Sequence, residues 1–309
     1  MDSSKNQPLV SVVTVNYNQS EVTCEFLESL KNISYKQIEI FVVDNDSPTD
    51  NPDIIKERYP YINLLKTGKN LGFAGGNNFA FPHCKGKYVL LINNDTEVDP
   101  GFLEPLVDLL ESDPTIGIVN PRVQYFFSPG VVQHGGYTPF NFTTIRNFSI
   151  GYGKKDEGQF MNISESGSTF GAAMLVPLKV IKEVGMMADV FFLYYEEHDW
   201  AARIKKAGYK TYYNGTSLVL HKESISTGKD SPFKTYYLYR GRILFARRNT
   251  YGFQKFIAMM YIYLITTPRI TLGFLLRFRF DHIWAYWKAV WWNLSHRKGI
   301  IFDLPKLEQ

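Results

Sequence analysis

The sequence has little cysteine, no start typical of a secreted protein and no long uninterrupted apolar run. Its 309 residues include two cysteines, Cys24 and Cys84, which can form at most one disulfide. The first residues, MDSSKNQP, lack the basic start and apolar stretch of a signal peptide. These absences exclude a disulfide-rich secreted scaffold and predict a reducing, cytoplasmic setting. The chain also has no internal repeat, which excludes a repeat protein.

The composition is globular, but the charge is unevenly distributed. Hydrophobic residues make up 45% and charged residues 21% of the chain. Residues 233–309 hold 13 Lys and Arg against three Asp and Glu, a net charge of +10, which leaves residues 1–232 at −6. The same region holds 19 of the 48 aromatic residues and four of the five tryptophans. We therefore expect an acidic body, residues 1–232, joined to a basic, aromatic region, residues 233–309.

Short β-branched runs alternate with stretches of helical period over the first 120 residues. The expected strands are 9–15, 38–43, 61–65, 87–92 and 116–119, and the expected helices are 21–31, 53–59, 77–83 and 101–111. This alternation predicts an α/β fold with a mostly parallel, Rossmann-like sheet flanked by helices. In such sheets, ligands bind at the carboxyl ends of the strands.

Polar residues follow three of these strands. They are Asn16-Tyr17-Asn18, Asp44-Asn45-Asp46-Ser47 and Asn93-Asn94-Asp95. Because parallel strands end at the same edge of a sheet, we expect the three groups to line one polar cleft.

The pattern changes after residue 120. Residues 120–165 have little periodicity, and we expect loops or a β-hairpin that shape a substrate site. Residues 170–176 then predict a strand, and residues 197–208 predict a helix that Gly208 ends as a C-cap.

Two polar stretches and one glycine-rich stretch have more than one interpretation. In LLINNDTEVDP, Asp95 and its amide neighbours offer the oxygen ligands that Mg²⁺ or Mn²⁺ accepts, or an Asx turn before the helix near Pro100. DNDSPTD is either a turn or, through Asp44, a nucleobase contact. GKNLGFAGGNN brings backbone amides and a helix start toward an anion, but it matches neither common phosphate-binding motif.

A further cluster, FFLYYEEHDWAARIKKAGY at 191–209, places Glu196, Glu197 and Asp199 at the start of a helix. Like charges this close raise at least one pKa, which suits a general base. Acidic residues are also ordinary at helix N-termini. The aromatic run before them favours the wall of a cleft.

Seven sequence blocks in this order resemble the family 2 inverting glycosyltransferases of the GT-A fold, in their rhamnosyltransferase-like branch. The blocks are VSVVTVNYN, VVDNDS, NLGFAGGNN, LLINNDTEVDPG, GAAMLV, FFLYYEEHDWAARIKKAGY and YYLYRGRILFARR. The resemblance covers about residues 9–248. It implies a catalytic domain at 1–232, with a nucleotide-sugar half at about 9–120 and an acceptor half at about 121–232.

The resemblance also implies site residues. Asp95 corresponds to the metal and diphosphate anchor, Asn93 stands where many members have Asp, and His221 completes the metal site in some members. Glu197, after Glu196, stands where most relatives carry the catalytic Asp, and Asp199 is the alternative base. The implied nucleotide-sugar contacts are Thr14, Asn16, Tyr17, Asp44, Asn45, Asn70, Gly76, Asn77, Asn93, Asn94 and Asp95, and the implied acceptor contacts are Gly171, Ala172, Tyr195 and Trp200.

The implied reaction is a metal-dependent, inverting transfer of a hexose from a nucleotide sugar, with Mg²⁺ or Mn²⁺. The branch implies L-rhamnose from dTDP-rhamnose, passed to a lipid-linked or oligosaccharide acceptor in assembly of a bacterial surface polysaccharide such as lipopolysaccharide. The alternatives are a UDP-sugar donor (GlcNAc, glucose, galactose or galactofuranose) and a non-catalytic sugar-nucleotide-binding scaffold. A nucleotidyltransferase would need a basic glycine-rich loop after the first strand, and NYNQS has none.

The C-terminal region predicts amphipathic helices. The apolar run 256–268 is too short to span a bilayer and ends at Pro268 and Arg269. Residues 282–298 place Ile283, Trp287, Val290, Trp291 and Leu294 on one stripe, with Lys288, Arg297 and Lys298 nearby. This predicts peripheral contact with an anionic membrane, on the cytoplasmic face of the inner membrane. Packing on the catalytic domain or a homodimer interface is the alternative, and no other feature supports nucleic-acid binding.

Overall fold

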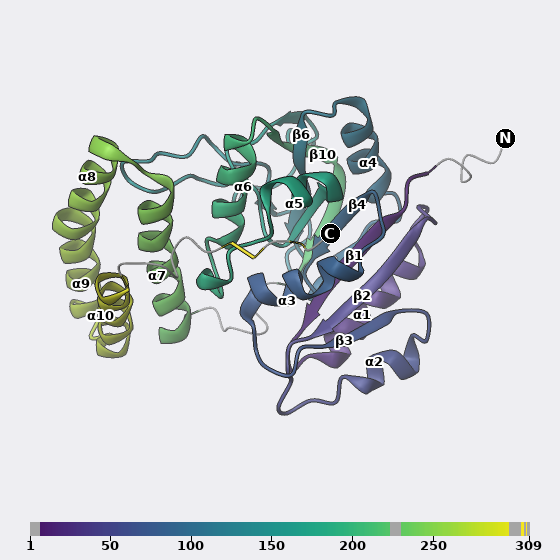
Figure 1. Ribbon diagram of the computed structural model, residues 1–309, viewed down its shortest axis with the longest axis horizontal. Helices are drawn as coiled ribbons and strands as arrows, with labels where there is room; N and C mark the ends of the chain where they lie inside the picture. Colours follow the sequence, from purple (N-terminus) through teal and green to yellow (C-terminus); the bar gives the residue numbers. More distant parts are fainter. Residues whose placement is uncertain (1–6, 223–229, 297–303, 306, 308–309) are drawn as a thin grey trace.

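A mixed β-sheet forms the centre of the molecule (Figure 1), as seen in a computed structural model that describes residues 7–222, 230–296, 304, 305 and 307. The strand order within these residues is β3-β2-β1-β4-β9-β6-β10-β5. The strands are β1 (Val10–Asn16), β2 (Ile38–Asp44), β3 (Asn63–Lys66), β4 (Tyr88–Ile92), β5 (Thr96–Val98), β6 (Ile116–Tyr125), β9 (Ala173–Pro177) and β10 (Lys210–His221).

The first four strands of this order, β3 to β4, are parallel to one another, as the alternating sequence pattern predicted. β9 then runs antiparallel to both β4 and β6, and β10 is parallel to β6. The five predicted strands are therefore all present, although β6 continues six residues beyond its predicted end. The carboxyl ends of β1, β2 and β4 lie at one edge, which prepares a shared site.

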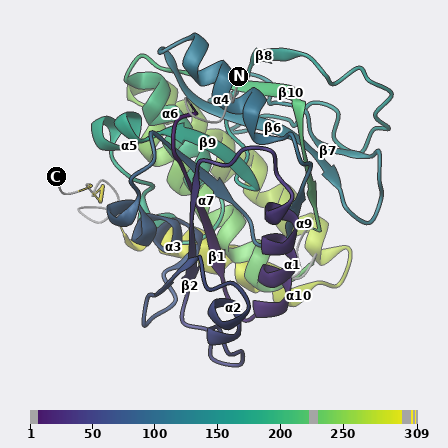
Figure 2. The same ribbon diagram turned by 90° about the vertical axis from the view of Figure 1, so that its right-hand side faces the viewer.

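Helices cover both faces of the sheet. They are α1 (Ser20–Lys31), α2 (Asp53–Arg58), α3 (Gly72–Ala80), α4 (Leu103–Ser112), α5 (Leu178–Val184) and α6 (Glu196–Lys206). β1 shows why both faces are buried, since Val10 and Val12 pack with α1, α2 and α4 while Val13 packs with α3, α5 and α6. Figure 2 shows α1 on one side of β1 and α3 and α5 on the other.

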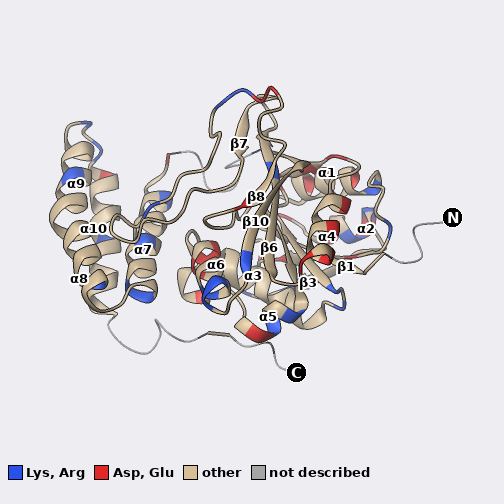
Figure 3. Ribbon diagram, turned by 90° about the horizontal axis from the view of Figure 1, so that it is seen from above, with Lys and Arg blue, Asp and Glu red and all other residues tan. Residues whose placement is uncertain are grey.

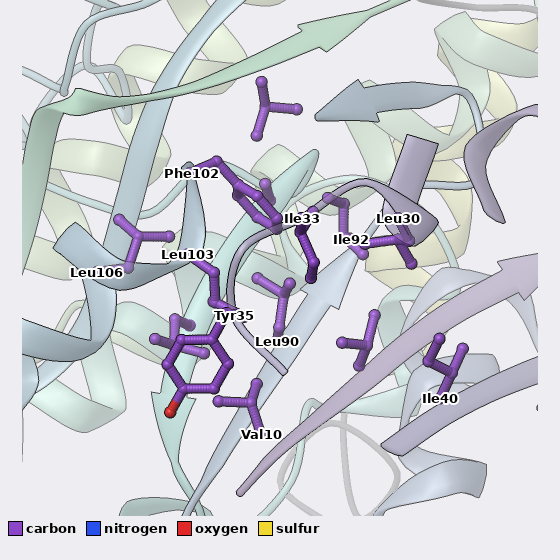
Figure 4. Packing of buried hydrophobic residues seen from close by; sticks show 14 of the residues in the cluster. Val10, Leu30, Ile33, Tyr35, Ile40, Leu90, Ile92, Phe102, Leu103 and Leu106 are labelled. Atoms are coloured by element: carbon purple, nitrogen blue, oxygen red, sulfur yellow. The ribbon is translucent and has the colours of Figure 1, made fainter. Parts of the chain in front are cut away.

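The core under α1 and α4 is closely packed. Figure 4 shows Phe102 and Leu106 from the α4 region and Leu30 and Ile33 from the end of α1 around Leu90 of β4. All five side chains are buried. Burying apolar area of this kind provides most of the folding free energy and holds the strand ends in place.

The segment between β6 and β9 forms the expected hairpin-like excursion. β7 (Val132–His134) pairs with β6, β8 (Ile163–Glu165) pairs with β10, and isolated bridges such as Val131 to Lys155 connect the loops. The C-cap of α6 is Ala207, and the predicted Gly208 follows it with φ of 97°, at the left-handed position where glycine commonly ends a helix.

Helices also make up the C-terminal region, and α7 links them to the body (Figure 1). They are α7 (Pro232–Asn249), α8 (Gly252–Met260), α9 (Thr267–Leu275) and α10 (Phe280–Ser295), with a π-helical turn, η4 (Tyr261–Thr266), between α8 and α9. α7 contacts α6 on one side and α8 and α10 on the other. The expected boundary at residue 232 therefore coincides with the start of a helix that packs on both parts.

The prediction of a short apolar segment ending at Pro268 is wrong. The helical run continues from Gly252 to Leu275, because Pro268 lies in the first turn of α9, where its missing amide costs little, and the π turn precedes it. By length and composition this run, with a mean hydropathy of 1.3, could cross a membrane. Core helices of soluble proteins pass the same test, so the length alone assigns no membrane role.

The predicted stripe on α10 also needs correction. Val290 is buried against the other helices, and the exposed stripe instead contains Trp284 together with Trp287, Trp291 and Leu294. The observed helix begins at Phe280, two residues before the predicted start at residue 282. Val290 belongs to its inner face. Arg297 and Lys298 lie outside the described residues.

Candidate active site

A cavity of about 380 Å³ opens at the carboxyl ends of β1, β2 and β4, as the sequence predicted. Residues from the strand ends, from α3, from β9, from α6 and from α7 meet there. Its lining includes Tyr17, Asn45, Asn70, Phe73, Asn77, Asn93, Asn94, Asp95, Gln133, Gly171, Ala172, Phe192, Tyr194, Glu196, Glu197, His221, Phe233 and Lys234.

Asn16 and Asp44 lie behind the lining and hold the two strand ends together. Asn16 donates from Nδ2 to Asp44 Oδ1 at 3.0 Å, and Ser47 donates from Oγ to the same oxygen at 2.6 Å. Both residues are buried. Thr14 and Gly76 are buried as well, and none of the four belongs to the cavity lining. These four residues, expected as nucleotide contacts, thus lie behind the cavity lining and support it. Tyr17 and Asn45 line the cavity itself.

The Asn45 side chain holds the glycine-rich stretch, residues 68–78, in place. Asn45 Nδ2 donates to Asn70 Oδ1 and to the Gly72 carbonyl, both at 3.1 Å, and Asn45 Oδ1 accepts from the Leu71 amide at 2.9 Å. Gly72 has φ of 70°, and a Cβ there would lie 2.2 Å from the Phe192 carbonyl oxygen, so only glycine fits. The first amides of α3 already donate to Asn70 and Phe192. This helix start therefore does not offer those amides to an anion.

Asp95 and His221 face each other across the base of the cavity. Asp95 Oδ1 lies 3.1 Å from His221 Nε2, and His221 Nδ1 lies 2.7 Å from Gln133 Oε1. Gln133 Oε1 can only accept, so its contact requires a proton on Nδ1 and leaves Nε2 facing the Asp95 carboxylate and, at 3.4 Å, Asn93 Nδ2. A cation, or a proton on Nε2, would satisfy the contact between Nε2 and the carboxylate.

The donor set fits a divalent ion. Adjacent ligands of an octahedral ion with bonds near 2.1 Å lie about 3 Å apart, close to the Asp95 to His221 separation. Within the described residues no cluster of three or more His, Cys, Asp or Glu is arranged for a metal. Such an ion would take its other ligands from substrate phosphates and water, which is the usual pattern for Mg²⁺ at nucleotide sites.

Glu196 and Glu197 begin α6 and both line the cavity. Burial raises the pKa of Glu196 well above its usual range, and the neighbouring charge of Glu197 raises it further. The raised pKa favours the neutral form of the Glu196 carboxyl. One carboxylate oxygen of Glu197, Oε2, is buried without a hydrogen-bond partner. The other lies 3.9 Å from His198 Nε2.

The segment before these acids has an unusual backbone. Phe192, Tyr194 and Tyr195 have φ of 63°, 66° and 75°, a region that aromatic residues rarely adopt. Arg240 of α7 holds the segment by donating from Nη2 to the carbonyls of Val190 and Phe191. Strain of this kind persists where the surroundings over-determine it, and it places the two glutamates at the cavity.

Asp199 and Trp200 are not part of the cavity lining, so the structure does not bring these two expected residues to the site. Burial alone would raise the pKa of Asp199, but Arg203 and Arg248 outweigh it and lower that pKa. Asp199 lies 2.8 Å from Arg248 Nε and 3.0 Å from Arg203 Nε, so its carboxylate is occupied by ion pairs. Trp200 is fully buried, stacks on Phe81 and donates to the Gly185 carbonyl.

Tyr195 lies beneath the cavity rather than on it. Its ring contacts His198 and Phe245, and it is not part of the cavity lining. Gly171 and Ala172 do line the cavity, and a Cβ on Gly171 would lie 3.9 Å from Glu197 Cγ. Of the four expected acceptor contacts, the structure brings these two to the site.

Several lining residues escaped the sequence-based prediction, among them Phe73, Gln133, Phe233 and Lys234. Gln133 orients His221 from the 120–165 segment, which has no periodic pattern. Phe233 and Lys234 come from the start of α7, in a region predicted as an appendage. The only sequence feature that pointed to Phe233 and Lys234 was the nearby YYLYRGRILFARR block, which begins two residues after Lys234.

The chain matches the family model "Glycosyl transferase family 2" over residues 11–165. It is 26% identical over 243 residues to the N-acetylglucosaminyl-diphospho-decaprenol L-rhamnosyltransferase of Mycobacterium tuberculosis, which covers 72% of this chain and 78% of the relative. It is 24% identical over 240 residues to the low-salt glycan biosynthesis hexosyltransferase Agl10 of Haloferax volcanii, covering 76% and 74%. These relatives confirm the predicted rhamnosyltransferase-like resemblance.

Solved structures show the fold. The mannosyltransferase PcManGT of Pyrobaculum calidifontis, in complex with GDP-Man and Mn²⁺, superposes with a TM-score of 0.59 at 15% identity, over 96% of this chain and 78% of that one. S. aureus TarS residues 1–349, in complex with UDP, gives 0.56 at 15% identity, over 85% and 75%. The chain belongs to glycosyl transferase family 2, as a glycosyltransferase of the GT-A fold.

Proposed function

We propose that the protein transfers a sugar from a nucleotide donor to a hydroxyl acceptor in one displacement that inverts the anomeric carbon. The observation that carries this proposal is the pairing, in one cavity, of a carboxylate at Glu197 with the Asp95 and His221 cation site. A base and a leaving-group site in the same cavity are what a direct displacement needs.

In this reaction Glu197 removes the proton of the acceptor hydroxyl as its oxygen attacks the anomeric carbon. Burial and the charge of Glu197 raise the pKa of Glu196, which disfavours a second negative charge beside the incoming oxygen. Lys234 brings a positive charge to the cavity from α7, where it would attract the donor diphosphate. A Mg²⁺ or Mn²⁺ ion held by Asp95 and His221 would neutralise the charge that develops on the leaving diphosphate. Asn93, Asn94, Asn70 and Asn77 add hydrogen-bonding groups without charge.

The proposed donor is dTDP-rhamnose. The support is the similarity to an L-rhamnosyltransferase over most of both chains. The structures that share the fold bind other nucleotides, among them GDP-Man and UDP, so the fold is compatible with several bases. A UDP-sugar is therefore the alternative donor, and the nucleotide experiment below separates the two.

The proposed acceptor is a lipid-linked saccharide or an oligosaccharide used in a bacterial surface polysaccharide, reached from the cytoplasmic face of the membrane. The support is that the mycobacterial relative is named for a diphospho-decaprenol acceptor. The small residues Gly171 and Ala172 line the cavity next to Glu197, and an acceptor can approach Glu197 from that side.

Donor binding is tested by thermal unfolding with dTDP-rhamnose, UDP-sugars and GDP-mannose, each with and without Mn²⁺. We expect dTDP-rhamnose with Mn²⁺ to raise the melting temperature by several degrees, because a ligand at 100 times its Kd stabilises the native state by about 2.7 kcal/mol. Asp95→Ala should abolish the Mn²⁺-dependent part of the shift.

The control is Asp108→Ala, which removes an exposed carboxylate of α4. It should leave the shift unchanged. A shift with UDP-sugars alone would replace the proposed donor. Equal shifts with and without Mn²⁺ would contradict the metal site, and binding without transfer of the sugar to any acceptor would favour a scaffold role.

A further inference from the structure

The C-terminal helices carry most of the exposed apolar surface. Of the 26 large hydrophobic side chains that are exposed among the described residues, 16 lie between Tyr251 and Leu294. Several are more than half exposed, including Phe253 at 76%, Phe278 at 77% and Trp291 at 71%. So many exposed large apolar side chains in one short region are uncommon on a soluble monomer and indicate a contact site.

α10 shows the pattern most clearly. Its inner face packs on α7 through buried residues, which are His282, Ala285, Tyr286, Ala289, Val290 and Asn293. Its outer face repeats at helical spacing and consists of Phe280, Trp284, Trp287, Trp291 and Leu294, all exposed. The inner face is thus mostly apolar, as on an ordinary surface helix, but the exposed side carries large aromatic residues as well.

The run Gly252–Leu275 lies beside α10 and continues this surface. Its protein side is marked by the buried Ala258, Ile262 and Thr266. Its exposed side chains include Phe256, Leu264 and other large apolar residues. Figure 1 places α8, α9 and α10 together at the end of the molecule farthest from the sheet, with α7 between them and the body.

The charges on this surface are mainly positive. Residues 251–295 contain five Lys and Arg and one acid, Asp281. Arg269, Arg277 and Lys288 are exposed beside the apolar side chains. Figure 3 shows that most Asp and Glu residues lie on the α/β body instead. An apolar surface with a basic rim is complementary to a lipid bilayer with anionic headgroups.

A second copy of the chain fits this surface less well, because two basic rims would face each other. A transmembrane arrangement also fits less well. α8, the first part of the run Gly252–Leu275, packs on α7, which carries Arg240, Arg242, Arg247 and Arg248, and spanning would draw these charges toward hydrocarbon. The one-sided exposure is that of helices lying in the plane of the interface.

We propose that α8, α9 and α10 form a membrane-docking surface that lies flat on an anionic bilayer, with Trp284, Trp287 and Trp291 inserted at headgroup depth and Arg269, Arg277 and Lys288 contacting lipid phosphates. Docking through this surface would hold the protein at the membrane, where the lipid-linked acceptor of the proposed function lies. It rests on surface residues outside the catalytic cavity, so docking and sugar transfer are tested separately.

The test is sedimentation of the full chain with vesicles of phosphatidylcholine alone or mixed with phosphatidylglycerol, without any sugar donor. We expect binding to the anionic vesicles, weakened by salt, and little binding to the neutral ones. Trp284→Gln combined with Trp291→Gln should reduce binding at least tenfold. Each of Arg269→Gln, Arg277→Gln and Lys288→Gln should reduce binding to anionic vesicles about fivefold.

Matched controls come from the other exposed side chains. Phe127→Gln with Phe148→Gln removes two aromatic residues that are 72% and 67% exposed on the body, and Lys155→Gln removes an exposed cation. These variants should bind vesicles like the parent chain. Variants are compared only if their melting temperatures match the parent.

Two results would overturn the proposal. One is that the folded parent chain stays in the supernatant with both kinds of vesicle. The other is a concentration-dependent dimer by light scattering that Trp284→Gln and Trp291→Gln dissociate, since a second copy would then cover the surface.

Discussion

Two neighbouring glutamates at the start of α6 differ through their surroundings alone. Both carboxyl groups line the cavity, and each has one buried oxygen without a hydrogen-bond partner. Glu196 is the more deeply buried of the two, and burial together with the adjacent charge raises its pKa. Because a raised pKa favours the neutral form of Glu196, Glu197 is the proposed base.

This difference predicts opposite results for two isosteric changes. Glu197→Gln removes the base and should lower kcat for rhamnose transfer from dTDP-rhamnose by about 10²–10⁴-fold. Glu196→Gln mimics the neutral form that the raised pKa of Glu196 favours, and it should keep most of the activity. Donor binding, measured by thermal shift, should be unchanged in both. Loss of activity only in Glu196→Gln would show that the two roles are reversed.

At the scale of elements, α6 and α7 are joined by a buried ionic cluster. Asp199 of α6 accepts from Arg203 on its own helix and from Arg248 and Asn249 on α7. Arg240 on the same α7 holds the strained segment before Glu196. The position of the proposed base is thus set by contacts with a helix that follows it by about 40 residues.

Breaking this cluster should destabilise the protein. Asp199→Asn leaves two buried guanidinium groups without a counter-charge and should lower the free energy of unfolding by about 3–5 kcal/mol near neutral pH. The folded pKa of Asp199 lies below its ordinary value of 3.8, so its stabilisation exists above that pH and is lost as the pH falls through the folded pKa.

Urea unfolding of the parent and Asp199→Asn at several pH values measures this effect. The difference between them should shrink in acid, below about pH 4. Asp156→Asn is the comparison, since it removes a buried carboxylate paired with Arg122 far from α7. A difference that does not depend on pH would mean that Asp199 acts through packing rather than charge.

At the scale of the whole molecule, the C-terminal helices complete the catalytic body instead of being appended to it. α7 contributes Phe233 and Lys234 to the cavity and Arg248 to the ionic cluster. Its inner side forms a core with Ala188 and Phe191 next to the glutamate segment. The division into a catalytic domain at 1–232 and a separate C-terminal region remains a prediction. The contacts of α7 with the cavity and with α6 argue against it.

Truncation measures how independent the two parts are. A chain of residues 1–231 should lose cooperative thermal unfolding and donor binding, because the core around α7 would be exposed and Asp199 would keep one of its two arginine partners. The full chain is the control. A truncated chain that melts cooperatively and binds dTDP-rhamnose would restore the boundary at 232.

The sequence by itself determined the parallel part of the sheet, most of the helices that cover it and the edge where ligands meet. Alternating apolar runs encode strands and helices locally, and polar residues after β1, β2 and β4 mark the edge because parallel strands end together. The seven ordered blocks also identified the family, and the pairing of Asp95 with His221 was anticipated across 126 residues.

Only the tertiary structure decided which polar groups are free to react. Asp199 and Glu197 look alike in sequence, but two arginines from different helices occupy the first and leave the second available. Likewise, whether α10 presents Val290 or Trp284 to solvent depends on how the helix packs on α7. Burial and charge pairing arise from distant contacts, and these appear only when the chain is folded.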